Sequence, residues 1–265
     1  METMTGTMLD LGTAEDDRAW KRVGRVAAYA AAIGFLILTV LYLLDVFDVL
    51  DPSPEYAATS AGQLQDEAHF WAQMFEHQHA ILWDVVARDI AGPVAFVALI
   101  VVGVALRRRA PGAGPQRQLM VTLLSAGGVM SAIASLLYLG NVEFWRLPWG
   151  GIPSGGETSI VAVGRATTAI DNVTVWLEAF GFVLVALGLW CLGATVRGSS
   201  DMPKRLGSLA YLTSAALLAL AIVSAMDADT ARSVMSLITG AILAPTLCIW
   251  MGSALGRTPA PAEPR

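Results

Sequence analysis

Charged side chains are scarce in this chain of 265 residues. Asp, Glu, Lys and Arg together make up 15% of the sequence, whereas hydrophobic residues make up 55%. A soluble domain usually carries about 25% charged residues. The missing charge is absent in long blocks, which excludes an ordinary soluble domain and predicts segments that cross a lipid bilayer.

Cysteine and catalytic motifs are also rare or absent. The two cysteines, Cys191 and Cys248, both lie inside apolar runs, which excludes a secreted disulfide scaffold. The first apolar run is too long for the hydrophobic part of a cleavable signal peptide. The sequence contains no phosphate loop, nucleophile elbow or nucleotide fingerprint. We therefore expect a protein without enzymatic activity and without a nucleic acid partner, for which the lipid bilayer is the first partner.

Long apolar runs dominate the rest of the sequence. Six of them approach or reach the roughly 20 residues that a helix needs to cross the hydrocarbon core. They are 26–49, 90–106, 119–140, 173–196, 206–226 and 234–255. Because they are continuous rather than alternating, and lipid offers no partner to an open backbone, they predict helices. The expected fold is all-α, a polytopic membrane protein with six transmembrane helices.

Basic residues predict the orientation of these helices. Thirteen of the seventeen Lys and Arg residues lie before the first run, between the second and third, between the fourth and fifth, or after the sixth. Segments of this kind are cytoplasmic by the positive-inside rule. The pattern is typical of a bacterial inner (plasma) membrane protein with both termini in the cytoplasm.

The connections between the runs predict three antiparallel hairpins. A cytoplasmic segment 1–25 precedes a transmembrane domain 26–255, and a cytoplasmic tail 256–265 follows it. Two long external loops, 50–82 and 141–170, are expected to contain helical extensions on the extracytoplasmic side. One such helix could begin at Thr59 or Ser60 and continue into the second run, and the other could begin at Thr158 or Ser159.

Ionisable residues are absent from the central and cytoplasmic parts of all six runs. Proton relays and ion paths usually need such residues at mid-membrane, so this absence argues against a proton pump or a charge-coupled carrier. The polar candidates gather at the outer ends instead. They are Asp45, Asp84, Arg88, Asp89, Glu143, Asp171 and Glu178.

These outer residues have two interpretations. Helical rise places Asp89 about 27 Å from Arg107, near the outer edge of the hydrocarbon core. The outer carboxylates could form a binding site for a cation or cationic ligand at the external mouth. Alternatively, they end their helices at the headgroups and pair with nearby arginines, as Asp84 could with Arg88 four residues later.

The three histidines fall within eleven residues of the first external loop. His69 and His77 share a helix face, and Met74 lies one turn before His77. Imidazole and thioether together suit copper, and imidazole with a carboxylate suits zinc. A complete site would need Glu143 or Asp171 from the other loop. The alternative is a solvated helix surface with no metal or other cofactor.

Three hypotheses of function follow. The first is a non-enzymatic protein that binds a small ligand at its extracytoplasmic mouth, or serves as a partner subunit or homo-oligomer. The second is a membrane metalloenzyme that uses His69, Met74 and His77. The third is a carrier of an uncharged or lipophilic small molecule, which needs no buried charge.

Overall fold

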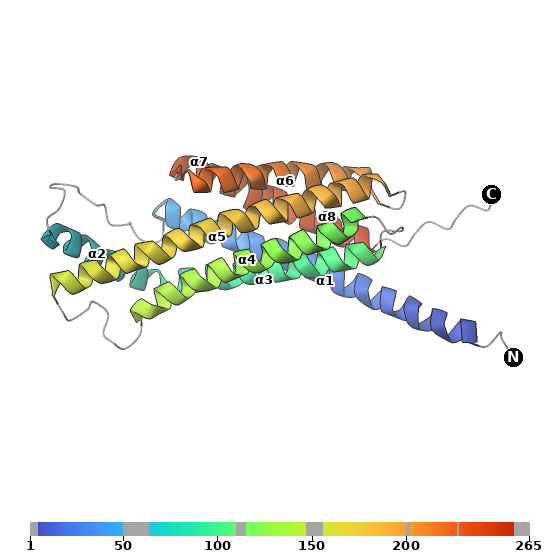
Figure 1. Ribbon diagram of the computed structural model, residues 1–265, viewed down its shortest axis with the longest axis horizontal. Helices are drawn as coiled ribbons and strands as arrows, with labels where there is room; N and C mark the ends of the chain where they lie inside the picture. Colours follow the sequence, from blue (N-terminus) through green and yellow to red (C-terminus); the bar gives the residue numbers. More distant parts are fainter. Residues whose placement is uncertain are drawn as a thin grey trace.

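The computed structural model describes residues 5–49, 64–109, 115–146, 156–199, 202–226 and 228–256, and these ranges contain helices and no strand (Figure 1). Six of the helical segments are long and apolar enough to cross a membrane. The predicted all-α fold with six transmembrane helices is confirmed, and the chain is a multi-pass membrane protein.

Helix continues beyond the apolar runs at both ends of four spans, and at the first end only in the first and fifth spans. The first five spans belong to α1 (Thr5–Val46), α3 (Leu82–Arg109), α4 (Pro115–Arg146), α5 (Glu157–Arg197) and α6 (Lys204–Ala225). The sixth combines α7 (Asp229–Ser236), a π-helical segment η1 (Leu237–Leu243) and α8 (Ala244–Gly256). A further helix outside the spans is α2 (Leu64–Ala80).

The six spans form a closed ring. α1 packs on α3, α3 on α4, α4 on α5 and α5 on α6, and the sixth span contacts both α6 and α1. Small residues allow the closest approaches. A Cβ added at Gly127 of α4 would lie 2.7 Å from the Gly181 carbonyl oxygen of α5. Each span therefore contacts the next, and the grouping into three hairpins stays a prediction.

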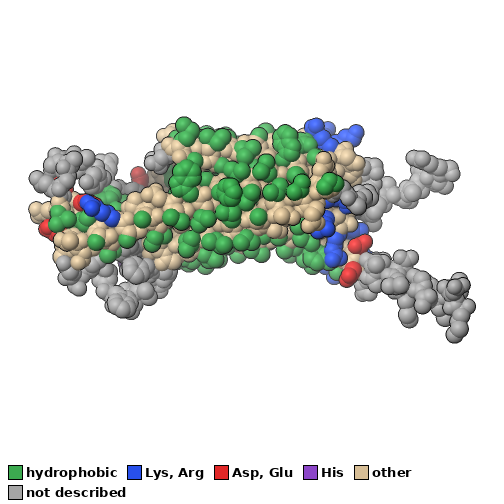
Figure 2. All heavy atoms as spheres, in the orientation of Figure 1, with side chains coloured by type: hydrophobic (Ala, Val, Ile, Leu, Met, Phe, Trp, Pro, Cys, Tyr) green, Lys and Arg blue, Asp and Glu red, His purple; other side chains and the backbone are tan. Residues whose placement is uncertain are grey.

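Lys and Arg side chains gather at the end of the bundle opposite α2, as Figure 2 shows. We call this the basic end. Arg109 donates a hydrogen bond to the Ala254 carbonyl of α8, and the Arg108 guanidinium lies 4.6 Å from the ring centre of Trp20. Large apolar side chains close the interior here. The fully buried ones are Leu106, Met120, Leu192, Leu206 and Leu255.

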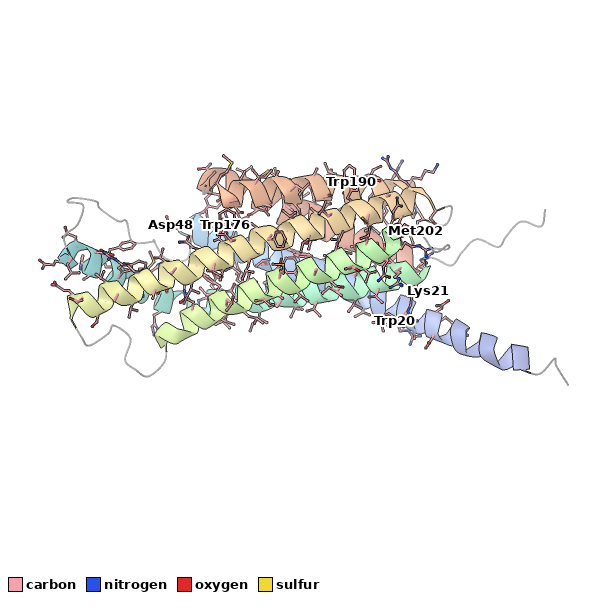
Figure 3. All side chains as sticks on the ribbon, in the orientation of Figure 1. Trp20, Lys21, Asp48, Trp176, Trp190 and Met202 are labelled. Carbon is pink, nitrogen blue, oxygen red and sulfur yellow. The ribbon has the colours of Figure 1, made fainter. Side chains whose placement is uncertain are left out.

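Exposed apolar side chains cover the outside of the ring between its two ends (Figure 2). Trp176 and Trp190 both project outward from α5 (Figure 3). Fourteen residues of helix separate them, or about 21 Å. The hydrocarbon core is about 30 Å thick, so this spacing is too short for the two rings to mark both edges of the bilayer, although tryptophan favours the membrane interfaces.

The prediction of one helix from the first external loop into the second span is wrong in one respect. A turn at Ile81 separates α2 from α3. Asp84 N–H bonds to the Ile81 carbonyl three residues back, so the regular four-residue ladder is interrupted there. The apolar stripe continues across this turn, which is why the sequence pattern did not reveal it. The predicted start at Thr59 or Ser60 lies outside the described residues.

The long helix α5 extends past the bundle and carries α2. The Trp71 ring of α2 lies against Gly164 of α5, where an added Cβ would overlap the indole. Beside it Arg165 donates two hydrogen bonds to Glu67, at 2.9 and 2.8 Å. The observed start of α5 at Glu157 confirms a helix near the predicted Thr158 or Ser159.

We expect Glu67→Gln to loosen the docking of α2 on α5. The Arg165 guanidinium lowers the pKa of Glu67. The stabilisation from this pair is thus present at pH values above the usual pKa of a glutamate. It is lost as pH falls through the lowered pKa of Glu67. Because Arg165 is 70% exposed, the pair stabilises the docked helix by up to about 1 kcal/mol, which is a factor of about five in the equilibrium constant for docking.

The measurement is the rate at which a water-soluble thiol reagent modifies a cysteine placed at the buried Ala68. At neutral pH this rate should rise up to about fivefold in Glu67→Gln. Glu76→Gln, which removes an exposed carboxylate from the same helix, is the control and should leave the rate unchanged. An equal rate in all three proteins would show that Trp71 alone holds α2.

Candidate functional site

The ring encloses a cavity of about 390 Å³ that is lined by residues of all six spans. Small-molecule pockets range from about 300 to 1,000 Å³, so the volume suits a small organic ligand. This cavity is the candidate functional site among the described residues.

Polarity changes along the length of the cavity. On α5 the lining residues recur at three- and four-residue steps, as one helix face requires. Asp171, Thr174 and Glu178 come first, and the apolar Phe182 and Leu189 follow toward the basic end. Asp171 and Leu189 are eighteen residues apart, or about 27 Å. The cavity is thus polar at one end and apolar over most of its depth.

The other spans repeat this gradient. On α1 the lining runs from Phe35 through Thr39 and Tyr42 to Asp45, and on α3 it runs from Leu99 through Phe96 to Arg88. All charged lining residues therefore meet at the end near α2. We call this group the charged mouth: Asp45, Arg88, Asp89, Asp171, Glu178 and Arg232.

Arg88 is the central cation of the charged mouth. Its side chain is 9% exposed, and it donates a hydrogen bond to Asp45 of α1 at 2.9 Å. Asp89 lies 3.9 Å from the same guanidinium. The ring centre of Tyr138 on α4 is 5.5 Å from the Arg88 Cζ atom. Arg88 thus connects three spans at the level where the cavity becomes polar.

The pairing expected from sequence between Asp84 and Arg88 is wrong. Four-residue spacing puts both on one face of α3, but the guanidinium reaches across to α1 instead. Asp84 is fully buried, and neither of its carboxylate oxygens has a hydrogen-bond partner. It lies near the charged mouth, within the electrostatic influence of Arg88 and Asp45, and does not line the cavity itself.

The remaining mouth residues form two smaller contacts. Arg232 of α7 lies 3.5 Å from Glu178, and its Cζ atom is 5.9 Å from the ring centre of Tyr42. Asp171 accepts a hydrogen bond of 3.0 Å from Asn141 of α4. Of the charged lining residues, four are carboxylates and two are guanidinium groups. The mouth therefore favours a positively charged partner over a negatively charged one.

A π-helical segment contributes to the middle of the cavity. η1 precedes Pro245, which has no N–H to offer the Ala241 carbonyl four residues back. π segments of this kind occur frequently at functional sites. Thr239 and Gly240 of η1 line the cavity, and the Thr239 hydroxyl is buried without a hydrogen-bond partner. The Thr39 hydroxyl of α1 lies where a Cβ at position 240 would be.

Five of the seven outer residues singled out in the sequence line this one cavity. They are Asp45, Arg88, Asp89, Asp171 and Glu178. Asp84 lies beside them, and the side chain of Glu143 lies outside the described residues. Sequence reasoning missed Arg232, Tyr42, Tyr138 and the η1 residues as lining groups. Pro245 inside an apolar run was the one available signal for η1.

The histidines are not gathered into a metal centre in the part of the chain that the structure describes. His69 is exposed on α2, Met74 is half-buried and His77 faces inward. No group of three or more His, Cys, Asp or Glu side chains among the described residues could hold a metal ion. A copper or zinc site at His69, Met74 and His77 stays a prediction without support from these contacts.

No protein-family model, curated protein or solved structure matches this chain.

Proposed function

We propose that this chain binds a small amphiphilic molecule with a positively charged head inside its helical ring. The observation that carries the proposal is the cavity, apolar through most of its depth and negatively charged at its mouth. The apolar part of the ligand packs among Phe96, Phe182 and Leu217. Its cationic head lies at the carboxylates, within reach of the Tyr42 and Tyr138 rings, since aromatic faces attract cations.

The distribution of charge supports an orientation in the membrane. By the positive-inside rule the basic end faces the cytoplasm, so both termini are cytoplasmic and the charged mouth is extracytoplasmic. In a bacterium this membrane is the inner (plasma) membrane. The ligand enters from the outer side.

Closure at the basic end favours binding over transport. The cavity stops at a tightly packed layer that includes Leu106, Leu192 and Leu206. A carrier of an uncharged or lipophilic molecule needs a second arrangement in which this layer opens. We therefore place ligand binding first, as the activity of a receptor or of a subunit that presents the ligand to a partner.

The test uses three probes that share one apolar body: 4-phenylbutyltrimethylammonium, 4-phenylbutanol and 4-phenylbutanesulfonate. Equilibrium dialysis against the protein in lipid nanodiscs measures each affinity. We expect the cation to bind about tenfold or more tightly than the sulfonate, since one net charge interaction at the mouth is worth about 1.4 kcal/mol. Equal affinities, or a preference for the sulfonate, would contradict the proposed charge of the head.

A substitution that fills the cavity locates the binding. Thr213 is fully buried, lines the cavity and bonds to the carbonyl of its own helix. Thr213→Phe should therefore lower affinity for the cation about tenfold or more by occupying its volume. Leu212→Phe adds a ring to the neighbouring exposed position on the lipid face and should change nothing. Equal affinity in both variants would place the probe outside the ring.

A further inference from the structure

Asp84 is the most unusual polar residue of the bundle. It is 0% exposed, and both of its carboxylate oxygens are buried without a hydrogen-bond partner among the residues that the structure describes. An ionised carboxylate in this position has lost its water and gained no donor in return. Burial of that kind is among the costliest arrangements in a protein, and the group usually takes up a proton instead.

The neighbours of Asp84 do not supply the missing positive charge. Arg88, one helical turn away, already bonds to Asp45 at 2.9 Å and lies 3.9 Å from Asp89. Asp89 is itself only 5% exposed, and its second oxygen also lacks a hydrogen-bond partner. Asp45 and Asp89 therefore share one guanidinium, and Asp84 lies within the electrostatic influence of the same cation. We call these four residues the Arg88 cluster: Asp45, Asp84, Arg88 and Asp89.

Groups on the other helices do not balance the cluster. Tyr138 of α4 presents its ring to Arg88. Glu178 of α5 adds a further negative charge and is paired with Arg232 of α7 at 3.5 Å. Asp171 of α5 is bonded to the uncharged Asn141, and Tyr42 of α1 lies beside Arg232. With every carboxylate ionised, the Arg88 cluster would carry two more negative than positive charges, with Asp84 and Asp89 buried and the Asp45 side chain 25% exposed.

The structure points to a proton site: the Arg88 cluster binds a proton at neutral pH, on Asp84 or Asp89, and releases it when a cation occupies the charged mouth. Asp89 lines the cavity, so a cationic head placed there supplies the positive charge that the cluster lacks. The proton then leaves to water at the mouth. The second half of this inference rests on the proposed function, whereas the first half does not.

The first experiment detects the proton without any ligand. Infrared spectroscopy of the protein in nanodiscs at pH 7 should show the C=O stretch of a protonated carboxyl group. Asp84→Asn or Asp89→Asn should remove this band, whereas Glu76→Gln, on an exposed carboxylate of α2, should leave it. If an asparagine variant fails to fold, Asp84→Glu and Asp89→Glu should shift the band. A wild-type spectrum without the band, or a band unaffected in both residues' variants, would overturn the proton site.

The second experiment measures exchange. Calorimetry of 4-phenylbutyltrimethylammonium binding in two buffers of different ionisation enthalpy gives the number of protons released. Release of one proton means that affinity rises about tenfold for each unit of pH increase, because fewer protons then compete with the cation. The asparagine variant that removes the infrared band, which fixes the uncharged form, should bind more weakly and lose this slope. Glu76→Gln, on an exposed carboxylate of α2 away from the cavity, should keep the slope.

Failure of the proton exchange can be distinguished from failure of the proposed function. Binding of the cation without proton release overturns the exchange and leaves the proposed function intact. Absence of binding overturns both the proposed function and the exchange, while the infrared band still decides whether the cluster holds a proton.

Discussion

Replacing Arg88 with alanine is expected to lower the free energy of unfolding by about 3–5 kcal/mol, the usual cost of removing one partner from a buried ion pair. Asp45 would lose its hydrogen bond of 2.9 Å, and Asp89 would lose the nearest positive charge. Asp89 is buried, whereas the Asp45 side chain is 25% exposed, so water can replace the guanidinium only in part. The remaining negative charges would also repel one another.

The measurement is the unfolding of detergent-solubilised protein with increasing sodium dodecyl sulfate, followed by tryptophan fluorescence. Arg165→Ala is the matched control, since this arginine is 70% exposed and its pair with Glu67 is solvated. It should cost at most about 1 kcal/mol. The double variant Asp45→Asn/Arg88→Met, which removes one negative charge together with the cation, should recover part of the loss. Equal stabilities of Arg88→Ala and Arg165→Ala would show that the charged mouth is open to water.

Alanine substitutions at two glycines of α4 are expected to change stability in opposite directions. At Gly127 an added Cβ would lie 2.7 Å from both the Gly181 carbonyl oxygen and the Val185 nitrogen, which are backbone atoms and cannot rotate away. Gly127→Ala should therefore cost about 1–3 kcal/mol through overpacking. Because the contact joins α4 to α5, the loss should also widen the cavity lined by Glu178 and Phe182.

Gly140 provides the control on the same helix. No atom lies within 4 Å of an added Cβ there, so alanine only restricts the unfolded chain and improves helix propensity. Gly140→Ala should stabilise the protein by about 0.5–1 kcal/mol. The same dodecyl sulfate titration measures both variants. A destabilised Gly140→Ala, or a neutral Gly127→Ala, would contradict the packing of α4 described above.

The spans could be predicted from sequence because the bilayer imposes one simple requirement. About 20 apolar residues must continue without a charge, and few other structures need such runs. The same reasoning placed Asp89 and Glu178 at one level, since helical rise converts sequence separation into depth. The structure places both residues in the lining of one cavity, whereas their depth in the bilayer stays a prediction.

Rotation about the helix axes could not be predicted in this way. Arg88 faces Asp45, forty-three residues away along the chain, because of how α1 packs on α3. Asp84, four residues before Arg88 on the same helix, satisfied the spacing rule for a pair. The sequence alone therefore indicated Asp84 as a possible partner and gave no sign of Asp45. The cavity was hidden for the same reason, since apolar runs look alike whether they meet in a packed core or around a space. The turn at Ile81 left no trace in the apolar periodicity.

The contact between α1 and α8 has a consequence for biosynthesis. A ribosome delivers the spans in order, and each can pack on its predecessor as it enters the membrane. The Arg88–Asp45 bond joins the first two spans, so it can form early and shield both charges from lipid. The ring, however, closes only when the final span reaches the first. A nascent chain that stops short of α8 therefore lacks the span that completes the ring, and under the proposed function ligand binding would require that translation of the last helix is complete.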